Sequence, residues 1–127
     1  IFRNARVVNV NGPPGKAFSV TFEINGQTFF ALNGGPQYSF TPAISFLVSC
    51  EDQAEVDELW SKLTAGGEEQ PCGWLTDRYG LSWRIVPSIL GRLIGNADRD
   101  KAGRAMQAML RMKKLDIAGL QRAFDGI

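Results

Sequence analysis

The stretch FSVTFEINGQTFFAL, residues 18–32, predicts a β-hairpin. Apolar and polar residues alternate strictly over 18–24, as they do in a strand that buries one face. Asn25-Gly26 supplies the two positive-φ positions of a type I′ turn, and the return strand is expected over 27–32. This turn fixes a register with two defined pairs, Phe22 with Phe29 and Glu23 with Thr28.

Further extended segments flank this hairpin. A strand is expected from Arg6 to Val10, before a Gly12-Pro13-Pro14-Gly15 loop, and another from Ile44 to Ser49. A second hairpin, or a strand with a bulge, is expected from the runs 74–77 and 81–86.

Helical periodicity begins after Ser49. Asp52 and Glu55 have the spacing of a capping box, and Gly66-Gly67 supplies a left-handed stop. The apolar stripe between them consists of Val56, Leu59, Trp60 and Leu63. Beyond Pro87 the sequence predicts only helices, with Ser88, Asn96 or Asp98, and Asp116 as their caps. Strands, one helix, strands and a helical tail indicate an α+β fold.

Composition excludes several classes of protein. The chain has 127 residues and a net charge of +1, which gives no reason to expect a nucleic-acid partner. No apolar run approaches membrane-spanning length, so no membrane partner is expected. The two cysteines fit a reducing compartment, with the cytoplasm as the default. The chain starts at Ile1, so we expect a fragment or a chain whose first ordered residue is internal.

Few residues are candidates for chemistry. Histidine is absent, which removes the usual base of serine and cysteine hydrolases. Cys72, between a glycine-rich turn and a strand, is either a reactive thiol or a small buried hydrophobe. Glu23 is the only acid in the first 50 residues, and it marks either a pocket or simple exposure. The acids of segment 51–69 indicate a solvated helix face, with an acidic docking site as the alternative.

Several motifs together resemble the PhnB-like branch of the glyoxalase/bleomycin-resistance/dioxygenase superfamily. The most specific is the block CGWLTDRYGLSW at 72–83, with LNGGP at 32–36 upstream, and the likeness spans nearly the whole chain. This branch often carries the label 3-demethylubiquinone-9 3-methyltransferase. The sequence does not support that label, because it has no glycine-rich loop after a strand to hold S-adenosylmethionine.

The resemblance implies a βαβββ module with a curved, mostly antiparallel sheet. On this basis 1–87 is expected to form the module, without its N-terminal strand and helix, and 88–127 a helical extension packed on the same domain. A single module implies a homodimer, in which two copies surround one pocket.

The resemblance also implies a place for a metal, which this sequence departs from. Members of the superfamily hold a divalent metal with His and Glu ligands, the last of them seven residues after the Asp of an Asp-x-x-Gly turn. Here that Asp is Asp77, the turn glycine is Gly80, and the ligand position is Arg84. No metal or other cofactor is therefore expected, unless residues before Ile1 supply ligands. Arg84 could instead clamp a carboxylate or phosphate, or pair with a neighbour such as Glu23.

The sequence thus favours a dimeric binding protein for an unidentified small molecule. Its predicted ligand contacts are Phe22, Glu23, Phe29, Asn33, Trp74, Trp83 and Arg84. One alternative is an enzyme acting on a small metabolite, through a metal held by other residues or through Cys72 or Glu23 as the reactive group. Another is a structural partner whose acidic helix and basic tail mediate self-association.

Overall fold

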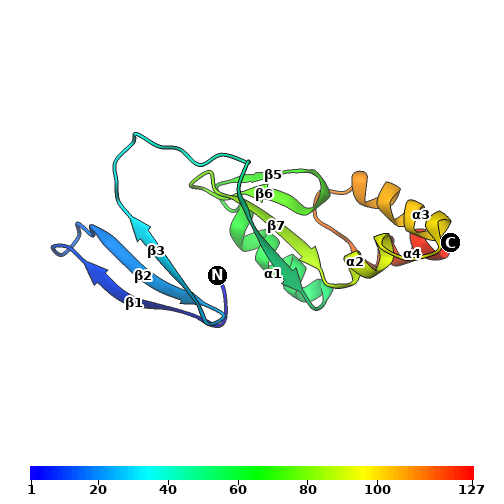
Figure 1. Cartoon of the computed structure of the whole chain (residues 1–127), viewed down its shortest axis with the longest axis horizontal. Helices are drawn as coiled ribbons and strands as arrows, with labels where there is room; N and C mark the ends of the chain where they lie inside the picture. The colour runs from blue at the N-terminus through cyan, green and yellow to red at the C-terminus, as the bar shows by residue number, and fades with distance from the viewer. The chain divides into compact units, whose positions relative to one another are not determined.

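The computed structural model describes residues 1–127 and contains the predicted hairpin. Strands β2 (Ser19–Ile24) and β3 (Gln27–Leu32) pair antiparallel in the predicted register. Asn25 and Gly26 join them with φ angles of 50° and 80°, as the type I′ turn requires. Figure 1 shows this hairpin in blue to cyan. The local sequence was sufficient to predict this register, because a two-residue turn sets the pairing of the strands that it joins.

The hairpin belongs to the first of two compact units, Ile1–Ser39. Strand β1 (Ala5–Asn11) pairs antiparallel with β2, so the sheet order is β1-β2-β3. Within this unit only Ser19 is buried, and apolar side chains such as Val7, Val10 and Phe30 are more than half exposed. The unit is a three-stranded sheet with little core of its own.

The second unit, Phe40–Ile127, contains a complete βαβββ order. Its elements before the helical tail are β4 (Ser45–Cys50), α1 (Gln53–Thr64), β5 (Glu68–Glu69), the 3₁₀ turn η1 (Pro71–Gly73), β6 (Trp74–Thr76) and β7 (Ser82–Pro87). The sheet order is β4-β7-β6-β5, with β4 parallel to β7 and the other pairs antiparallel. Parallel strands need a long crossover connection. Here α1 carries the chain from edge strand β4 to the opposite edge strand β5, and the chain then returns through β6 to β7.

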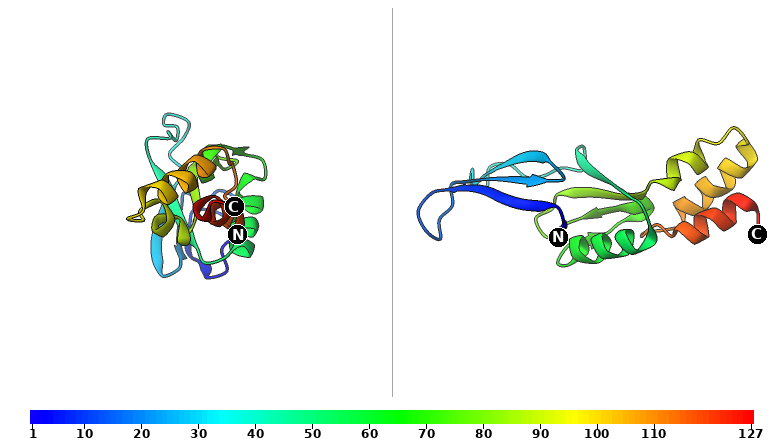
Figure 2. Two further views of the ribbon diagram at one scale, coloured as in Figure 1. Left: turned by 90° about the vertical axis from the view of Figure 1, so that its right-hand side faces the viewer. Right: turned by 90° about the horizontal axis from the view of Figure 1, so that it is seen from below.

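Helix α1 packs on one face of this sheet (Figure 2). Its buried residues are the predicted stripe, Val56, Leu59, Trp60 and Leu63. The Trp60 indole N–H donates to Glu69 Oε1 at 2.6 Å, which ties the helix to β5. Asp52 caps the helix by accepting from the Glu55 N–H at 2.9 Å. The Glu55 carboxylate accepts from the Glu51 N–H, one residue earlier than a capping box predicts.

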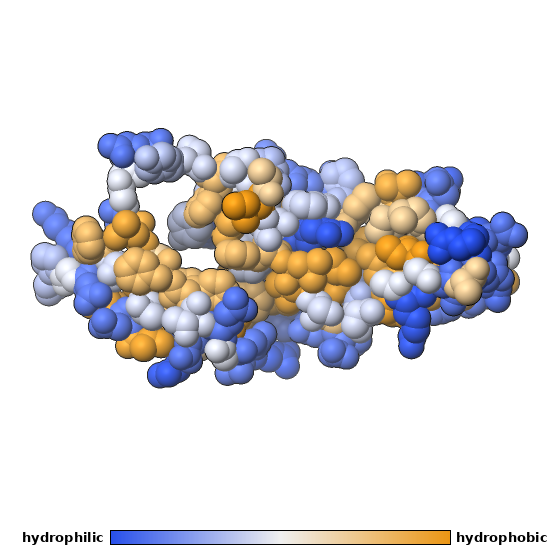
Figure 3. All heavy atoms as spheres, in the orientation of Figure 1, coloured by the Kyte–Doolittle hydropathy of each residue, from blue (hydrophilic) through white to orange (hydrophobic).

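Three helices complete the second unit: α2 (Ile89–Ile94), α3 (Arg99–Leu110) and α4 (Ile117–Asp125). They enclose a core of Leu90, Leu93, Ala105, Leu115 and Leu120. Hydrophilic atoms gather on the surface where α3 and α4 lie (Figure 3). Asp98 caps α3 by accepting from the Lys101 N–H, but the side chains of Ser88 and Asp116 make no capping bond. The capping bond at the start of α4 comes instead from Gln53 of α1, whose Oε1 accepts from the Ile117 N–H at 2.8 Å.

Backbone hydrogen bonds join this helical tail to the sheet. The N–H groups of Cys72 and Gly73 donate to the carbonyl oxygens of Met112 and Lys113, each at 2.8 Å. The compact units therefore divide the chain after Ser39 and group the tail with residues 40–87. The sequence-based division into 1–87 and 88–127 stays a prediction about domains, while the strand–helix–three-strand order lies within 45–87.

No helix combines the length and apolar character that a membrane span needs.

Substitution of Gly67 tests the close approach between the end of α1 and the β6–β7 turn. A Cβ atom at Gly67 would overlap the carbonyl oxygen of Thr76 and the backbone of Asp77. We expect Gly67→Ala to lower the free energy of unfolding by about 1–3 kcal/mol, measured by urea denaturation. Gly103→Ala is the control, because nothing lies within 4 Å of its Cβ position and alanine favours the helix. Equal effects of the two substitutions would contradict this packing.

Candidate functional site

Strand β7 separates a core face from a polar face. Trp83 and Ile85 point toward α1 and are buried, with Ile85 0% exposed. Because side chains alternate along a strand, Ser82 and Arg84 point to the opposite face of the sheet. Cross-strand contacts agree with this assignment. The ring centres of Trp83 and Phe46 lie 5.3 Å apart in an edge-to-face contact, whereas Arg84 lies over the ring of Trp74.

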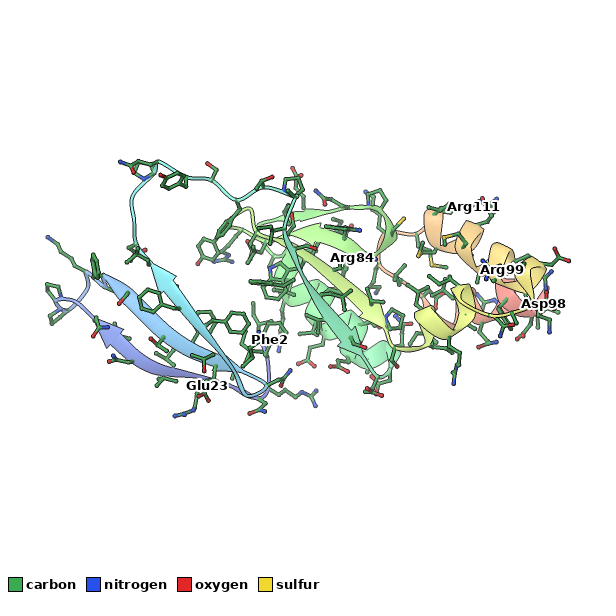
Figure 4. The ribbon with its side chains drawn as sticks, in the orientation of Figure 1. Phe2, Glu23, Arg84, Asp98, Arg99 and Arg111 are labelled. Carbon is green, nitrogen blue, oxygen red and sulfur yellow. The ribbon has the colours of Figure 1, made fainter.

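The strand register places two rows of side chains on the face opposite α1. We call this surface the Arg84 face. One row runs across β4, β7 and β6 as Leu47, Arg84 and Trp74, and the next runs as Ser45, Ser82 and Thr76. A row of three hydroxyl groups therefore lies beside a row that combines an apolar, a cationic and an aromatic side chain. Figure 4 labels Arg84 on β7, between its neighbouring strands.

Two polar atoms on this face have no hydrogen-bond partner. Arg84 Nε and Ser82 Oγ are both buried and unpartnered, and the whole Ser82 residue is only 1% exposed. The guanidinium carbon of Arg84 lies 5.1 Å from the centre of the Trp74 ring, in the geometry of a cation–π contact. Buried donors without partners are rare in folded proteins. This face therefore contains hydrogen-bonding capacity that the chain itself does not use.

Arg84 makes no ion pair, although one acid stands on the same sheet face. That acid is Glu68 of β5, the register partner of Thr76, which extends the hydroxyl row by one strand. Glu23, the neighbour considered from the sequence, instead accepts a hydrogen bond from Arg6 Nε at 3.1 Å within the first unit. Its carboxylate is therefore paired across strands β1 and β2. Arg84 is held by its aromatic neighbour rather than by an ion pair.

The predicted ligand contacts do not all lie together. In the first unit the rings of Phe22 and Phe29 stack with their centres 5.3 Å apart, on the sheet face opposite Glu23. Asn33 serves its own loop, where its side-chain amide donates to the Ala17 carbonyl oxygen at 2.6 Å. Alternation along each strand explains why adjacent predicted residues separate onto opposite faces.

The residues predicted in the second unit separate in the same way. Trp83 belongs to the core face, and its indole N–H donates to Asp77 Oδ2 at 3.0 Å. Trp74 and Arg84 share one face. Ser82 was missed in the sequence, although the alternation from Leu81 to Val86 already placed it with Arg84.

Comparison with known proteins identifies the family. The family described as 3-demethylubiquinone-9 3-methyltransferase matches residues 1–86, which include both sheets. The chain belongs to this family. A Bacillus cereus structure, titled as a PhnB protein of the same methyltransferase description, is 30% identical. The match covers 68% of this chain and 82% of that chain, with a TM-score of 0.62.

A second solved structure, of a protein from Staphylococcus aureus, is 22% identical over 67% of this chain and 75% of that chain. Its TM-score of 0.30 is too low to indicate a shared fold. No curated protein matches the sequence.

The family match and the Bacillus cereus structure agree with the α+β fold expected from the sequence. The helices after Pro87 lie outside the family match.

The residues at the expected metal position of this family member do not fit a metal. Arg84 occupies the position of the last ligand, and the chain has no histidine. No group of three or more His, Cys, Asp or Glu side chains lies together. A fixed guanidinium repels a divalent cation, so the Arg84 face is suited to anions instead.

The two cysteines of the family member differ in their surroundings. Cys50 is buried, and burial, followed by the charges of Glu55, Asp52 and Glu51, raises its pKa to about 12. Cys72 is partly exposed in a left-handed backbone conformation with φ of 63°, and no hydrogen bond reaches its sulfur. A base that would activate Cys72 is therefore not among its contacts.

Two hollows are lined by residues other than those of the Arg84 face. The larger, of about 640 Å³, is bordered by α3 and α4, and its lining includes Arg99, Arg104 and Arg111. Figure 4 labels Arg99 and Arg111 in this part of the chain. Two of these arginines bond backbone carbonyl oxygens: Arg99 bonds those of Ile94 and Asn96, and Arg104 those of Ala123 and Phe124. The smaller hollow, of about 130 Å³, lies beside Arg6 and Glu23.

The unpartnered hydroxyl of Ser82 leads to a prediction about stability. Ser82→Ala removes a buried polar atom that makes no hydrogen bond. We expect the free energy of unfolding to stay unchanged or to rise by about 1 kcal/mol, measured by urea denaturation in the absence of added ligand. Ser61→Ala, at an exposed position on α1, is the control. A loss larger than about 1 kcal/mol in Ser82→Ala alone would mean that the hydroxyl has a protein partner.

Alkylation distinguishes the two cysteines. Because thiolate is the reacting form, a pKa of about 12 leaves Cys50 almost entirely protonated below pH 10. With iodoacetamide at pH 8, we expect Cys72 to be labelled at least ten times faster, followed by peptide mass spectrometry. In urea both cysteines should react at similar rates. Fast labelling of Cys50 in the folded protein would show that its surroundings open readily.

Proposed function

We propose that this protein is a homodimeric binding protein for a small organic molecule, which it holds on the Arg84 face without the metal site of the superfamily. The observation that carries the proposal is the state of Arg84. This residue stands on an interior strand of the sheet, its Nε is buried without a partner, and its guanidinium is fixed against Trp74. A bound molecule would complete this hydrogen bonding.

The residue types on the Arg84 face also support binding of an organic molecule. Leu47 and Trp74 are apolar walls on either side of Arg84, and the serine and threonine hydroxyls can orient polar groups. The arginine replaces the carboxylate that the superfamily uses for its metal. This replacement favours recognition of a negatively charged group over metal chemistry.

Dimerisation is supported by exposed apolar surface. Val7 and Val10 on edge strand β1 are 62% and 55% exposed. Apolar side chains on unpaired strand edges favour association with another chain. A second copy is the partner we propose, since isologous pairing is the commonest form of assembly.

Methyl transfer is not the proposed activity. The family description names that reaction, but methyl transfer needs a donor, and the chain has no glycine-rich turn between a strand and a helix that would bind one. We also place the protein in the cytoplasm, a proposal that rests on its two free cysteines.

Native mass spectrometry of the protein purified without added metal or chelator tests this proposal. We expect a dimer mass that includes a bound organic molecule, which denaturation releases for identification. We expect no stoichiometric divalent metal. The monomer mass of 14.0 kDa provides the reference.

Two outcomes would contradict parts of the proposal. A monomer at micromolar concentration would exclude the dimer. One divalent metal per chain would mean that ligands other than those near Arg84 form a metal site, and an enzyme would then be the better hypothesis.

A further inference from the structure

We infer that Ser82 and Arg84 together form the recognition site for a carboxylate on the bound molecule. This inference rests on the proposed function, because it names the chemical class of ligand for the same face. It starts from the distribution of unpartnered polar atoms. The structure contains two buried side-chain polar atoms without a hydrogen-bond partner, and they belong to these two residues.

The positions of the two atoms make one shared ligand the simplest explanation. Ser82 and Arg84 are two residues apart on β7, so they point to the same face with Cα atoms about 6.6 Å apart. Both can donate a hydrogen bond, Ser82 through its hydroxyl and Arg84 through Nε–H. Two neighbouring donors without acceptors match an anion with two adjacent oxygen atoms.

The charge on the face selects the anion. Arg84 is the only cation among the paired residues of this face, and Glu68, opposite Thr76 on β5, is its one acid. A carboxylate carries one negative charge, which matches the single charge of Arg84. Its two oxygens match the two hydrogen-bond donors, Ser82 and Arg84. A phosphate monoester carries nearly two charges and three free oxygens, for which this face has no second cation.

Preorganisation strengthens the site. The guanidinium is already stacked on Trp74 at 5.1 Å, so ligand binding does not have to order a free arginine side chain. Arg84 Nε and Ser82 Oγ are both buried, so a ligand reaches them only when the side chains that cover them move aside. Hydrogen bonds between charged groups in such surroundings are stronger than bonds between neutral groups.

Leu47 defines where the rest of the ligand lies. It neighbours Arg84 on the side away from Trp74 and is 56% exposed. Trp74 is already covered by the guanidinium, so Leu47 is the free apolar surface next to the anion site. The ligand class is therefore a monocarboxylate with an apolar body.

Nuclear magnetic resonance of the Arg84 Nε–Hε group tests the inference directly. The full chain, labelled with ¹⁵N and assigned through Arg84→Lys, is titrated separately with benzoate, with its neutral analogue benzamide, and with phenyl phosphate. We expect benzoate to shift the Arg84 signal saturably. Benzamide and phenyl phosphate should bind at least about tenfold more weakly, because one lacks the charge and the other exceeds the charge of the site.

Paired variants assign the effect to the two donors. Ser82→Ala and Arg84→Lys should each weaken benzoate binding by about tenfold or more, followed through backbone amide shifts. Arg84→Lys keeps the positive charge but loses the Nε–H group. Ser61→Ala and Arg92→Gln are matched controls at exposed positions on α1 and α2, and they should bind benzoate as the unmodified chain does.

The outcomes separate this inference from the proposed function. If benzamide or phenyl phosphate binds as well as benzoate, the carboxylate site is wrong while small-molecule binding stands. If benzoate leaves the Arg84 signal unchanged but native mass spectrometry finds another organic molecule, only this inference fails. If no probe binds and no organic mass is released, both fail. The titration of the unmodified chain decides the question even if a variant does not fold.

Discussion

The alternation of side chains along β7 is the constraint on which the second unit depends. This strand lies between β4 and β6, so both of its edges are hydrogen-bonded and its register with both neighbours is fixed. Trp83 and Ile85 supply the core against α1, and Ser82 and Arg84 supply the opposite face. A shift of one residue would exchange these roles, placing the guanidinium in the core and the indole outside. The core and the candidate site are therefore specified by the same register.

The crossover through α1 adds the second requirement. Because β4 runs parallel to β7, Leu47 and Ser45 stand level with Arg84 and Ser82. Helix α1 can make this connection because its apolar stripe covers the core face and leaves the other face to the candidate site. Hydrogen bonds also join the first turn of α1 to the helical tail. The Gln53 side chain donates to the Leu115 carbonyl oxygen and accepts from the Ile117 N–H. The tail thereby stabilises the start of the helix that shapes the module.

Arg84 stands at the position where the resemblance to the superfamily led us to expect a metal-binding carboxylate. A carboxylate on a sheet face attracts a divalent cation, whereas a guanidinium held on an indole attracts an anion. Family membership describes the scaffold, and the side chains on one face decide what that scaffold can bind. The acid that the sequence suggested as a partner for Arg84 forms an ion pair with Arg6 within the first unit.

The sequence by itself determined the local elements. Asn25-Gly26 specified the first hairpin and its register, the four-residue stripe from Val56 to Leu63 specified α1, and Asp98 specified the start of α3. These features depend on contacts between residues close in the chain, and sequence patterns describe such contacts well. The cap of α4 could not be found in this way, because its acceptor comes from Gln53, 64 residues earlier.

Tertiary structure decided which candidate residues meet. Phe22 and Glu23 are adjacent in sequence but lie on opposite faces of the first sheet, and Asn33 bonds the backbone of its own loop. Trp83 and Arg84 are neighbours in sequence but face opposite sides of the sheet. The rows Leu47–Arg84–Trp74 and Ser45–Ser82–Thr76 exist only after three strands pair in one register. Strand pairing brings together residues distant in sequence, and this is why the candidate site became visible only in the folded chain.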